Sequence, residues 1–292
     1  MWRRGLAGLA ALLLLALPVR AETEADLLLV LAVDASGSVS EQRFNLQRQG
    51  YADAFRAPRL HQAIRSGPLG AVAVMMFQWT GPGMQVPSVA WTRLADPASA
   101  MAFARGIETA PRALFSGGTS ISGAIDHGMR MLALAPFTAA RRVIDVSGDG
   151  ANNRGRPAED ARDDAVAAGV VINGLPILAM EYNLDGFYRD HVIGGPGSFM
   201  IPVASFEEFA PAVLRKLVTE IAGTAPQRFS VARNPLIASA TNAGVCTAMK
   251  WPLSSAWNRA PGIACAIGST SAGGRSLSWM PANSSAGQAI WP

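Results

Sequence analysis

Residues 27–40 read LLLVLAVDASGSVS and decide the fold of the chain. The apolar first half of this stretch runs directly into Asp34, and a short polar turn follows. A continuous apolar run that ends in turn residues is typical of a strand buried on both faces of a parallel sheet. Residues 40–65 then have the apolar spacing of a helix. We therefore expect Asp34, Ser36 and Ser38 at a strand-to-helix turn, where open α/β sheets bind ligands.

This turn offers one carboxylate and two hydroxyl groups at alternate positions, from Asp34, Ser36 and Ser38. Three hard oxygen donors directed to one point suit Mg²⁺. The alternative is helix capping, because Ser and Asp are preferred N-cap residues and Ser38 with Glu41 fits a capping box. The same side chains can cap a helix and bind a metal, so both interpretations stay open.

Two later loops carry further polar residues of the same kind. Thr119 follows a pair of glycines and precedes a helical pattern, and Asp149 follows the strand-like segment 141–147. Each residue also has an ordinary interpretation, Thr119 as a helix cap and Asp149-Gly150 as a turn.

Together, the stretch DASGS at residues 34–38, Thr119 and Asp149 resemble the signature of von Willebrand factor A domains. In that family these pieces form the metal-ion-dependent adhesion site, abbreviated MIDAS. The resemblance covers residues 26–223, and within it the chain is similar to an uncharacterised bacterial family of exported A-like domains. The chain departs from the family pattern at Gly148, where a Thr is common, and at Ile121, where a polar residue is common.

The resemblance implies a role for each residue of the motif. Ser36, Ser38 and Thr119 would bind Mg²⁺ directly, with Mn²⁺ or Ca²⁺ as possible substitutes, and Asp34 and Asp149 would act largely through water. Neutral direct ligands leave the ion electron-poor, with a coordination position open to a carboxylate of a partner protein. The implied function is therefore metal-dependent adhesion or recognition without turnover.

Two other functions compete with recognition. One is a metal-assisted hydrolase that uses Asp34, and the other is a scaffold whose metal only stabilises its loops. The aspartyl phosphatase pattern needs a second Asp where this chain has Ser36, and the sequence contains no G-x-S-x-G nucleophile elbow. No P-loop or dinucleotide-binding fingerprint occurs either. We therefore expect a protein that is not an enzyme.

The remaining pattern predicts a doubly wound α/β fold, a mostly parallel central sheet with helices on both faces. Its strand at residues 86–94 alternates apolar and polar residues, which favours an antiparallel edge strand. The predicted strands are residues 27–33, 71–80, 86–94, 141–147, 170–178 and 199–204, and the predicted helices are 40–65, 96–107, 120–134, 157–168, 185–192 and 205–221.

One acidic residue, Asp145, falls inside a predicted strand, where an unpaired charge would be costly. The favoured interpretation pairs it with Arg141 or Arg142. The alternative makes it an acceptor for hydroxyl groups close to the metal.

Residues 1–21 have the pattern of a signal peptide. Arg3 and Arg4 precede an apolar stretch, and small residues lead to a cleavage site at Ala21. This apolar stretch is shorter than the roughly 20 residues that span a bilayer. We expect export to the periplasm or the medium after cleavage near Ala21, with no stable membrane span; a retained anchor is the alternative.

Residues 224–292 differ in composition from the predicted domain at residues 22–223. They contain no acidic residue and no lasting apolar period, which indicates a low-complexity, mostly disordered tail. Both cysteines of the chain, Cys246 and Cys265, lie here and can pair in an oxidising compartment. Without cysteines, the domain can hold neither a cysteine zinc site nor a thiol nucleophile.

Charge gives no indication of nucleic-acid binding. The whole chain has a formal net charge of +4, but all 21 acidic residues lie in residues 22–223, where they outnumber the basic ones. The positive balance therefore belongs to the two ends of the chain and is no evidence for a basic binding surface. The sequence leaves the oligomeric state and the identity of the partner open.

Overall fold

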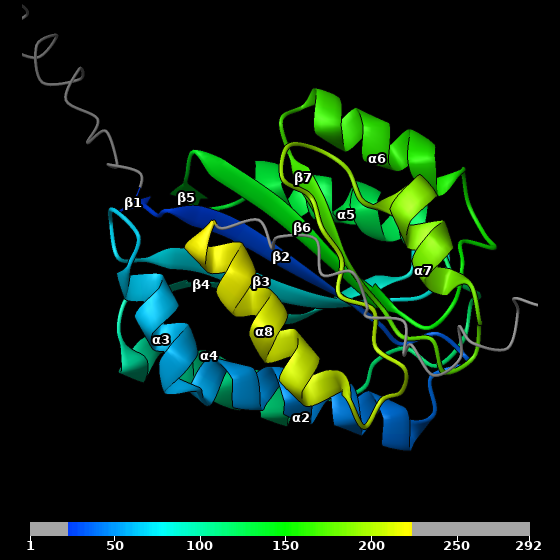
Figure 1. Cartoon of the computed structure of the whole chain (residues 1–292), viewed down its shortest axis with the longest axis horizontal. Coiled ribbons are helices and arrows are strands. Elements are labelled where there is room, and N and C mark those ends of the chain that lie inside the picture. The colour runs from blue at the N-terminus through cyan, green and yellow to red at the C-terminus, as the bar shows by residue number, and fades with distance from the viewer. Residues whose placement is uncertain (1–22, 224–292) are drawn as a thin grey trace, which may run out of the picture. The chain divides into compact units, whose positions relative to one another are not determined.

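The computed structural model describes residues 23–223, and Figure 1 shows how their helices and strands are arranged. The predicted signal peptide, the predicted disordered tail and the possible Cys246–Cys265 disulfide lie outside the described residues.

A mixed sheet forms the centre of the described domain. Its five strands stand in the order β4-β3-β2-β6-β7, and only the edge pair β3–β4 is antiparallel. The strands are β2 (Leu27–Asp34), β3 (Val72–Trp79), β4 (Gln85–Leu94), β6 (Arg141–Gly148) and β7 (Val171–Pro176). A separate two-stranded sheet pairs β1 (Thr23–Glu24) with β5 (Phe137–Thr138). This topology confirms the predicted sheet with its antiparallel edge strand.

Strand β2 lies in the middle of the sheet, and all of its residues are buried. Successive side chains of a strand point to opposite faces. Leu29 and Leu31 accordingly belong to one hydrophobic core, whereas Leu28 and Val30 belong to the other. The uninterrupted apolar run of the sequence thus reflects two cores that share one strand.

Helices cover both faces of the sheet (Figure 1). One face carries α2 (Glu41–Arg56), α3 (Pro58–Arg65), α4 (Pro97–Thr109) and α8 (Phe209–Ala222). The other carries α5 (Ile121–Ala133), α6 (Ala158–Ala167), α7 (Leu184–Phe187) and the short π-helix η2 (Tyr188–Val192). Among the residues described, no helix has the length and apolarity to cross a membrane.

Three predicted segments differ from the structure. The helix predicted at 40–65 breaks at Ala57, which is extended because it precedes Pro58. The segment predicted as a strand at 199–204 makes only isolated bridges, Met200 to Gly174 of β7 and Val203 to Ile177 just beyond β7. The helix predicted to begin at Ser205 begins at Phe209 instead, without a side-chain cap.

The predicted pairing of Asp145 with Arg141 or Arg142 is wrong. Asp145 lies midway along β6, fully buried, and its Oδ1 is 2.6 Å from Nζ of Lys216 on α8. The two arginines instead donate to backbone carbonyl groups, Arg141 to those of α8 and Arg142 to Ala168.

Candidate metal-ion site

The five residues of the sequence motif lie at the edge of the sheet where the parallel strands end. We call them the candidate site: Asp34, Ser36, Ser38, Thr119 and Asp149. Asp34 is the last residue of β2, and Asp149 directly follows the neighbouring strand β6. Thr119 lies in the loop before α5, just ahead of the N-cap residue Ser120.

Hydrogen bonds join the first turn to the loop that carries Asp149. The Oγ of Ser38 donates to Oδ1 of Asp149 at 2.6 Å, and the hydroxyl oxygens of Ser36 and Ser38 are 3.1 Å apart. Asp34 accepts from the backbone of both loops, from the N–H of Ser36 at 2.7 Å and that of Asp149 at 3.4 Å. The carboxylates and the serine hydroxyls therefore form one connected group.

The loop of Thr119 is fastened to the same place through Asn153. The backbone N–H of Thr119 donates to Oδ1 of Asn153 at 2.9 Å, and the N–H of Asn153 donates back to the Thr119 carbonyl at 2.9 Å. A Cβ atom on Gly150 would lie 3.7 Å from Oγ1 of Thr119, so this hydroxyl faces the backbone next to Asp149.

The structure also decides the capping alternative. Ser40 caps α2 by accepting from the N–H of Arg43, and Ser120 caps α5 by accepting from the N–H of Gly123. Ser38 and Thr119 do not fill these positions, so the capping interpretation of both residues is wrong. Their hydroxyl groups are left for the candidate site.

The two carboxylates of the candidate site are buried close to each other. Burial raises the pKa of Asp34 to about 7, and repulsion from Asp149 adds to this effect. Burial also raises the pKa of Asp149, while the hydrogen bond from Ser38 and the charge of Arg43 oppose the rise. The Oδ2 atom of Asp149 has no hydrogen-bond partner, and Nη1 of Arg43 is 3.9 Å away.

This donor set fits a hard divalent cation. The cluster holds hydroxyl and carboxylate oxygens only, which are the ligands that Mg²⁺, Mn²⁺ and Ca²⁺ prefer. A cation would neutralise both acidic residues and give the unpartnered oxygen of Asp149 an electrostatic partner.

Gly148, where the family often has Thr, is explained by crowding. A Cβ atom at this position would lie 3.0 Å from Oδ2 of Asp34, 3.0 Å from the Tyr188 hydroxyl and 3.2 Å from the Trp79 ring. The tryptophan and tyrosine fill the space that a threonine side chain would need.

Arg112 supports the turn that carries Ser36 and Ser38 and was not singled out from the sequence. Its Nη2 donates to the backbone carbonyls of Ala35, Ser36 and Val39, the last at 2.6 Å. Its guanidinium also lies over the ring of Phe115. Arg112 sits in an irregular loop distant in sequence from the turn, and no local pattern points to this contact.

Exposed apolar side chains surround the candidate site. Phe115 is 60% exposed and precedes the Thr119 loop, and Met84 is packed on Gly117 of that loop. Met180 and Tyr182 are exposed on either side of Glu181, whose carboxylate accepts from the N–H of Ala151 at 2.7 Å. We call Met84, Phe115, Met180 and Tyr182 the apolar rim.

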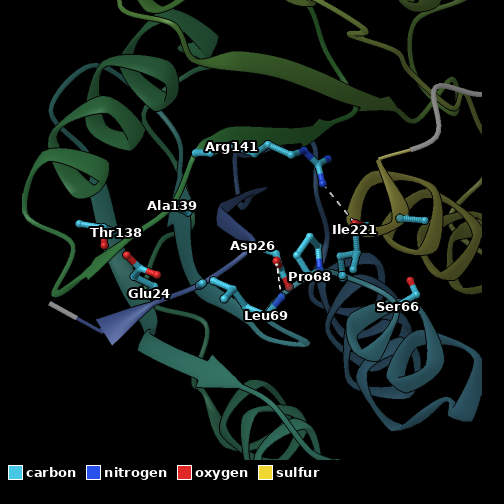
Figure 2. A pocket seen from close by; sticks show the side chains of 13 residues that line it. Glu24, Asp26, Ser66, Pro68, Leu69, Thr138, Ala139, Arg141 and Ile221 are labelled. Atoms are coloured by element: carbon cyan, nitrogen blue, oxygen red, sulfur yellow. Dashed lines mark hydrogen bonds between the residues drawn. The ribbon is translucent and has the colours of Figure 1, made fainter.

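A cavity of about 570 Å³ lies at the other edge of the sheet, where the strands begin (Figure 2). Its lining includes Asp26 beside the start of β2, Arg141 at the start of β6 and Ile221 near the end of α8. In Figure 2, Asp26 bonds to Leu69 and Arg141 reaches Ile221, so these two charged groups already have partners within the fold. None of the candidate-site residues lines this cavity.

Comparison with solved structures gives von Willebrand factor A-like neighbours. Proximal thread matrix protein 1 from the mussel byssus is 13% identical, with a TM-score of 0.50, and the match covers 69% of this chain and 49% of that one. A form of the same mussel protein with a zinc-occupied MIDAS motif is 14% identical, with a TM-score of 0.50 over 68% of this chain and 46% of that one. A von Willebrand factor type A protein from Catenulispora acidiphila is 15% identical, with a TM-score of 0.49 over 68% of this chain and 43% of that one.

This chain thus spans slightly less than half the length of each of these three solved structures. Among curated proteins, no sequence matches it. A family model described as "Protein of unknown function (DUF1194)" matches residues 24–225.

Proposed function

The chain belongs to the DUF1194 family, and we propose that its von Willebrand factor A-like domain is an exported recognition module. In this proposal the candidate site binds a divalent metal ion, and an acidic group of a partner protein completes the coordination of that ion. A bound divalent ion would supply an electron-poor centre with a position open to a carboxylate oxygen.

The observation that carries the proposal is the pair of buried carboxylates. Asp34 and Asp149 are 0% and 1% exposed, and repulsion between them helps to raise the pKa of Asp34. Among the described residues, Arg43 is the basic group recorded within 4 Å of either carboxylate. Its Nη1 is 3.9 Å from Oδ2 of Asp149, which is long for an ion pair. Keeping two acids buried at this edge costs stability unless a cation neutralises them.

The residues of the candidate site would have two different roles in metal binding. Ser36, Ser38 and Thr119 would supply hydroxyl oxygens as direct ligands. Asp34 and Asp149 would provide negative charge and orient those hydroxyls, as the bond from Ser38 to Asp149 does here. We propose Mg²⁺ as the resident ion, because all five side chains are hard oxygen donors, with Mn²⁺ or Ca²⁺ as substitutes.

The apolar rim supports a protein as the partner. Large exposed apolar side chains near a polar centre are typical of protein-binding surfaces. Here Phe115 and Tyr182, 60% and 97% exposed, belong to two different loops beside the candidate site. A partner that contributes one carboxylate to the metal would bury these side chains around it.

We infer that the site binds without catalysing a reaction. The histidines, which are the usual general bases, are engaged elsewhere. His61 bonds the Phe55 carbonyl, His191 pairs with Glu159, and His127 packs edge-on against Phe77. The competing functions, a metal-assisted hydrolase and a scaffold with a structural metal, are separated from recognition by the experiment below.

Calorimetric titration of the purified chain with MgCl₂ and MnCl₂ tests the metal site. We expect saturable binding by the wild type and none by the Ser36→Ala/Thr119→Ala double variant, which loses two hydroxyl ligands. The matched control is Ser40→Ala, which removes the neighbouring hydroxyl that caps α2. Equal binding heats for the wild type and the double variant would refute the site.

Partner capture from exported protein of the source cells, with Mg²⁺ and again with chelator, then tests recognition. We expect the wild type to capture a protein in Mg²⁺ and to release it in chelator. The Asp34→Ala variant should not capture this protein. Metal binding without a metal-dependent partner would favour the scaffold. Metal-dependent turnover of a phosphoester, peptide or glycoside that Asp34→Ala abolishes would favour the hydrolase.

A further inference from the structure

A second group of charged residues lies in the core between β6 and α8, separate from the candidate site. Lys216 and Asp145 are completely buried, and Glu220 is 2% exposed. Lys216 and Glu220 stand one turn apart on α8, so both reach the same point of the sheet. Lys216 thus faces two buried carboxylates inside the protein.

The contact between Lys216 and Asp145 is close but lacks hydrogen-bond geometry. Nζ of Lys216 is 2.6 Å from Oδ1 of Asp145, yet neither this nitrogen nor either oxygen of Asp145 has a hydrogen-bond partner. The carboxyl carbon of Asp145 is one bond beyond Oδ1. The amine therefore lies against the carboxyl group, but outside the alignment of a hydrogen bond.

Glu220 is oriented toward the same amine. Its Oε1 accepts from Nδ2 of Asn173 at 2.6 Å, while its Oε2 has no hydrogen-bond partner and lies 3.5 Å from Nζ of Lys216. Asn173 is the residue of β7 paired in register with Asp145, and its own Oδ1 accepts from the N–H of Phe199. The sheet thus holds Asp145 beside the amide that orients Glu220.

Aromatic side chains border this buried group. The ring of Phe199 makes a cation–π contact with Lys216, 5.2 Å from its Nζ, and the pKa of Tyr51 on α2 is raised by burial and by the nearby charge of Asp145. Burial raises the pKa of Glu220, although the charge of Lys216 opposes the rise. Condensing the amine with the carboxyl group of Asp145 would remove one positive and one negative charge from this core.

We propose that Lys216 and Asp145 join in an intramolecular amide bond, an isopeptide crosslink between α8 and β6, with Glu220 moving the proton. A proton first passes from the ammonium to the Asp145 carboxylate, which leaves the net charge unchanged. The Nζ lone pair then attacks Cγ of Asp145 and forms the C–N bond. Glu220 takes a proton from the nitrogen and delivers it to the Asp145 hydroxyl, the C–O bond breaks, and water leaves.

The reaction is balanced and needs no further reagent. One amine and one carboxylic acid give one amide and one water molecule, and Glu220 returns to its starting state. A cavity of about 330 Å³ borders Glu220 and Asn173 on their outer side and offers the water an exit. No step involves the metal site, so the crosslink can be tested separately from the proposed function.

Tryptic digestion of the denatured full chain, followed by mass spectrometry, tests the crosslink. Trypsin cannot cut after a lysine whose amine is acylated. A linked protein therefore yields a branched product that joins residues 143–154 to residues 216–228, lighter than the sum of the two peptides by one water molecule. Complete cleavage after Lys216, with residues 143–154 recovered at their linear mass, would overturn the proposal.

Variants separate the nucleophile from the proton carrier. Lys216→Arg should give no branched product, whereas Glu220→Gln should form it at least roughly a hundredfold more slowly in freshly synthesised protein. Glu208→Gln, an exposed glutamate at the start of α8, is the matched control and should behave as wild type. Equal rates for Glu220→Gln and wild type would remove Glu220 from the mechanism. If Glu220→Gln does not fold, the wild-type digest still decides whether the bond exists.

Discussion

The hydroxyl of Ser38 donates a 2.6 Å hydrogen bond to the carboxylate of Asp149, 111 residues further along the chain. This bond joins the turn after β2 to the loop after β6, two parallel strands that are neighbours in the sheet. It leaves the second carboxylate oxygen of Asp149 without a hydrogen-bond partner. Arg43, at 3.9 Å, is the charged partner recorded for that oxygen, so this buried acid is only weakly neutralised.

Replacing Asp34 by Asn should stabilise the metal-free protein and abolish its response to metal. The substitution removes one of two like charges that are buried together, so at pH 8 in chelator we expect a gain on the order of 1–3 kcal/mol in the free energy of unfolding. Thermal melting with and without Mg²⁺ measures both effects. The control is Asp26→Asn, which removes a carboxylate that binds two backbone N–H groups elsewhere. It should lower stability and leave the Mg²⁺ response intact.

The stability of the metal-free protein should fall as the pH rises. The pKa of Asp34 is raised from 3.8 to about 7 in the folded state, so the folded protein binds more protons than the unfolded chain between these values. The contribution of Asp34 is fully present below about pH 4 and is lost as the pH rises through about 7, with a size on the order of a few kcal/mol.

Saturating Mg²⁺ should reverse this trend, because the ion stabilises the ionised carboxylates and competes with protons for them. Denaturant unfolding at a series of pH values, with Mg²⁺ and with chelator, gives the two curves. Parallel curves would show that no metal binds to ionised Asp34.

Replacing Arg112 by Ala should weaken metal binding more than it weakens the fold. The guanidinium holds three carbonyl groups of the turn that carries Ser36 and Ser38, and without it these two serines are less well positioned. Loss of such orienting contacts typically lowers metal affinity about 10–100-fold. The control is Arg48→Ala, because Arg48 donates to a single carbonyl, that of Ala110. Similar losses of affinity in both variants, measured by calorimetry, would contradict a specific role for Arg112.

Replacing Gly148 by Thr should destabilise the domain, although Thr is common at this position in the wider family. The new Cβ would meet Asp34, Tyr188 and Trp79 at 3.0–3.2 Å, and overpacking of this kind costs about 1–3 kcal/mol. Gly37→Ala, where the nearest atom is 3.8 Å away, should change the free energy of unfolding by no more than about 0.5 kcal/mol. Denaturant titration compares the two variants, and equal stability would show that Trp79 and Tyr188 move to make room for the new side chain.

The main features of the fold were predictable because they depend on local pattern. The continuous apolar run before Asp34 predicted a central strand, and the alternation in β4 predicted the antiparallel edge. Pro58 ends the preceding helix by a local rule, and the prediction overlooked it. Ser38 and Thr119 were singled out as site residues from their motif, but only the structure shows that Ser40 and Ser120 are the caps.

The supporting contacts were not predictable, because each joins segments far apart in sequence. Arg112 reaches carbonyl groups about seventy-five residues earlier in the chain, and backbone carbonyls leave no sequence signal. Asp145 was recognised as a costly buried acid, yet nearby arginines looked like better partners than Lys216 on the last helix. That choice depended on proximity in sequence, whereas the packing of α8 on β6 decides the partner.

The two ends of the described domain lie on the side opposite the candidate site. Glu24 at its start and Ala222 at its end line the same cavity, where the strands begin, whereas Asp34 and Asp149 stand where the strands end. A domain that is tethered through either end therefore presents its apolar rim and candidate site outward. A flexible connection at either end would therefore leave the binding face free, on the side away from the point of attachment.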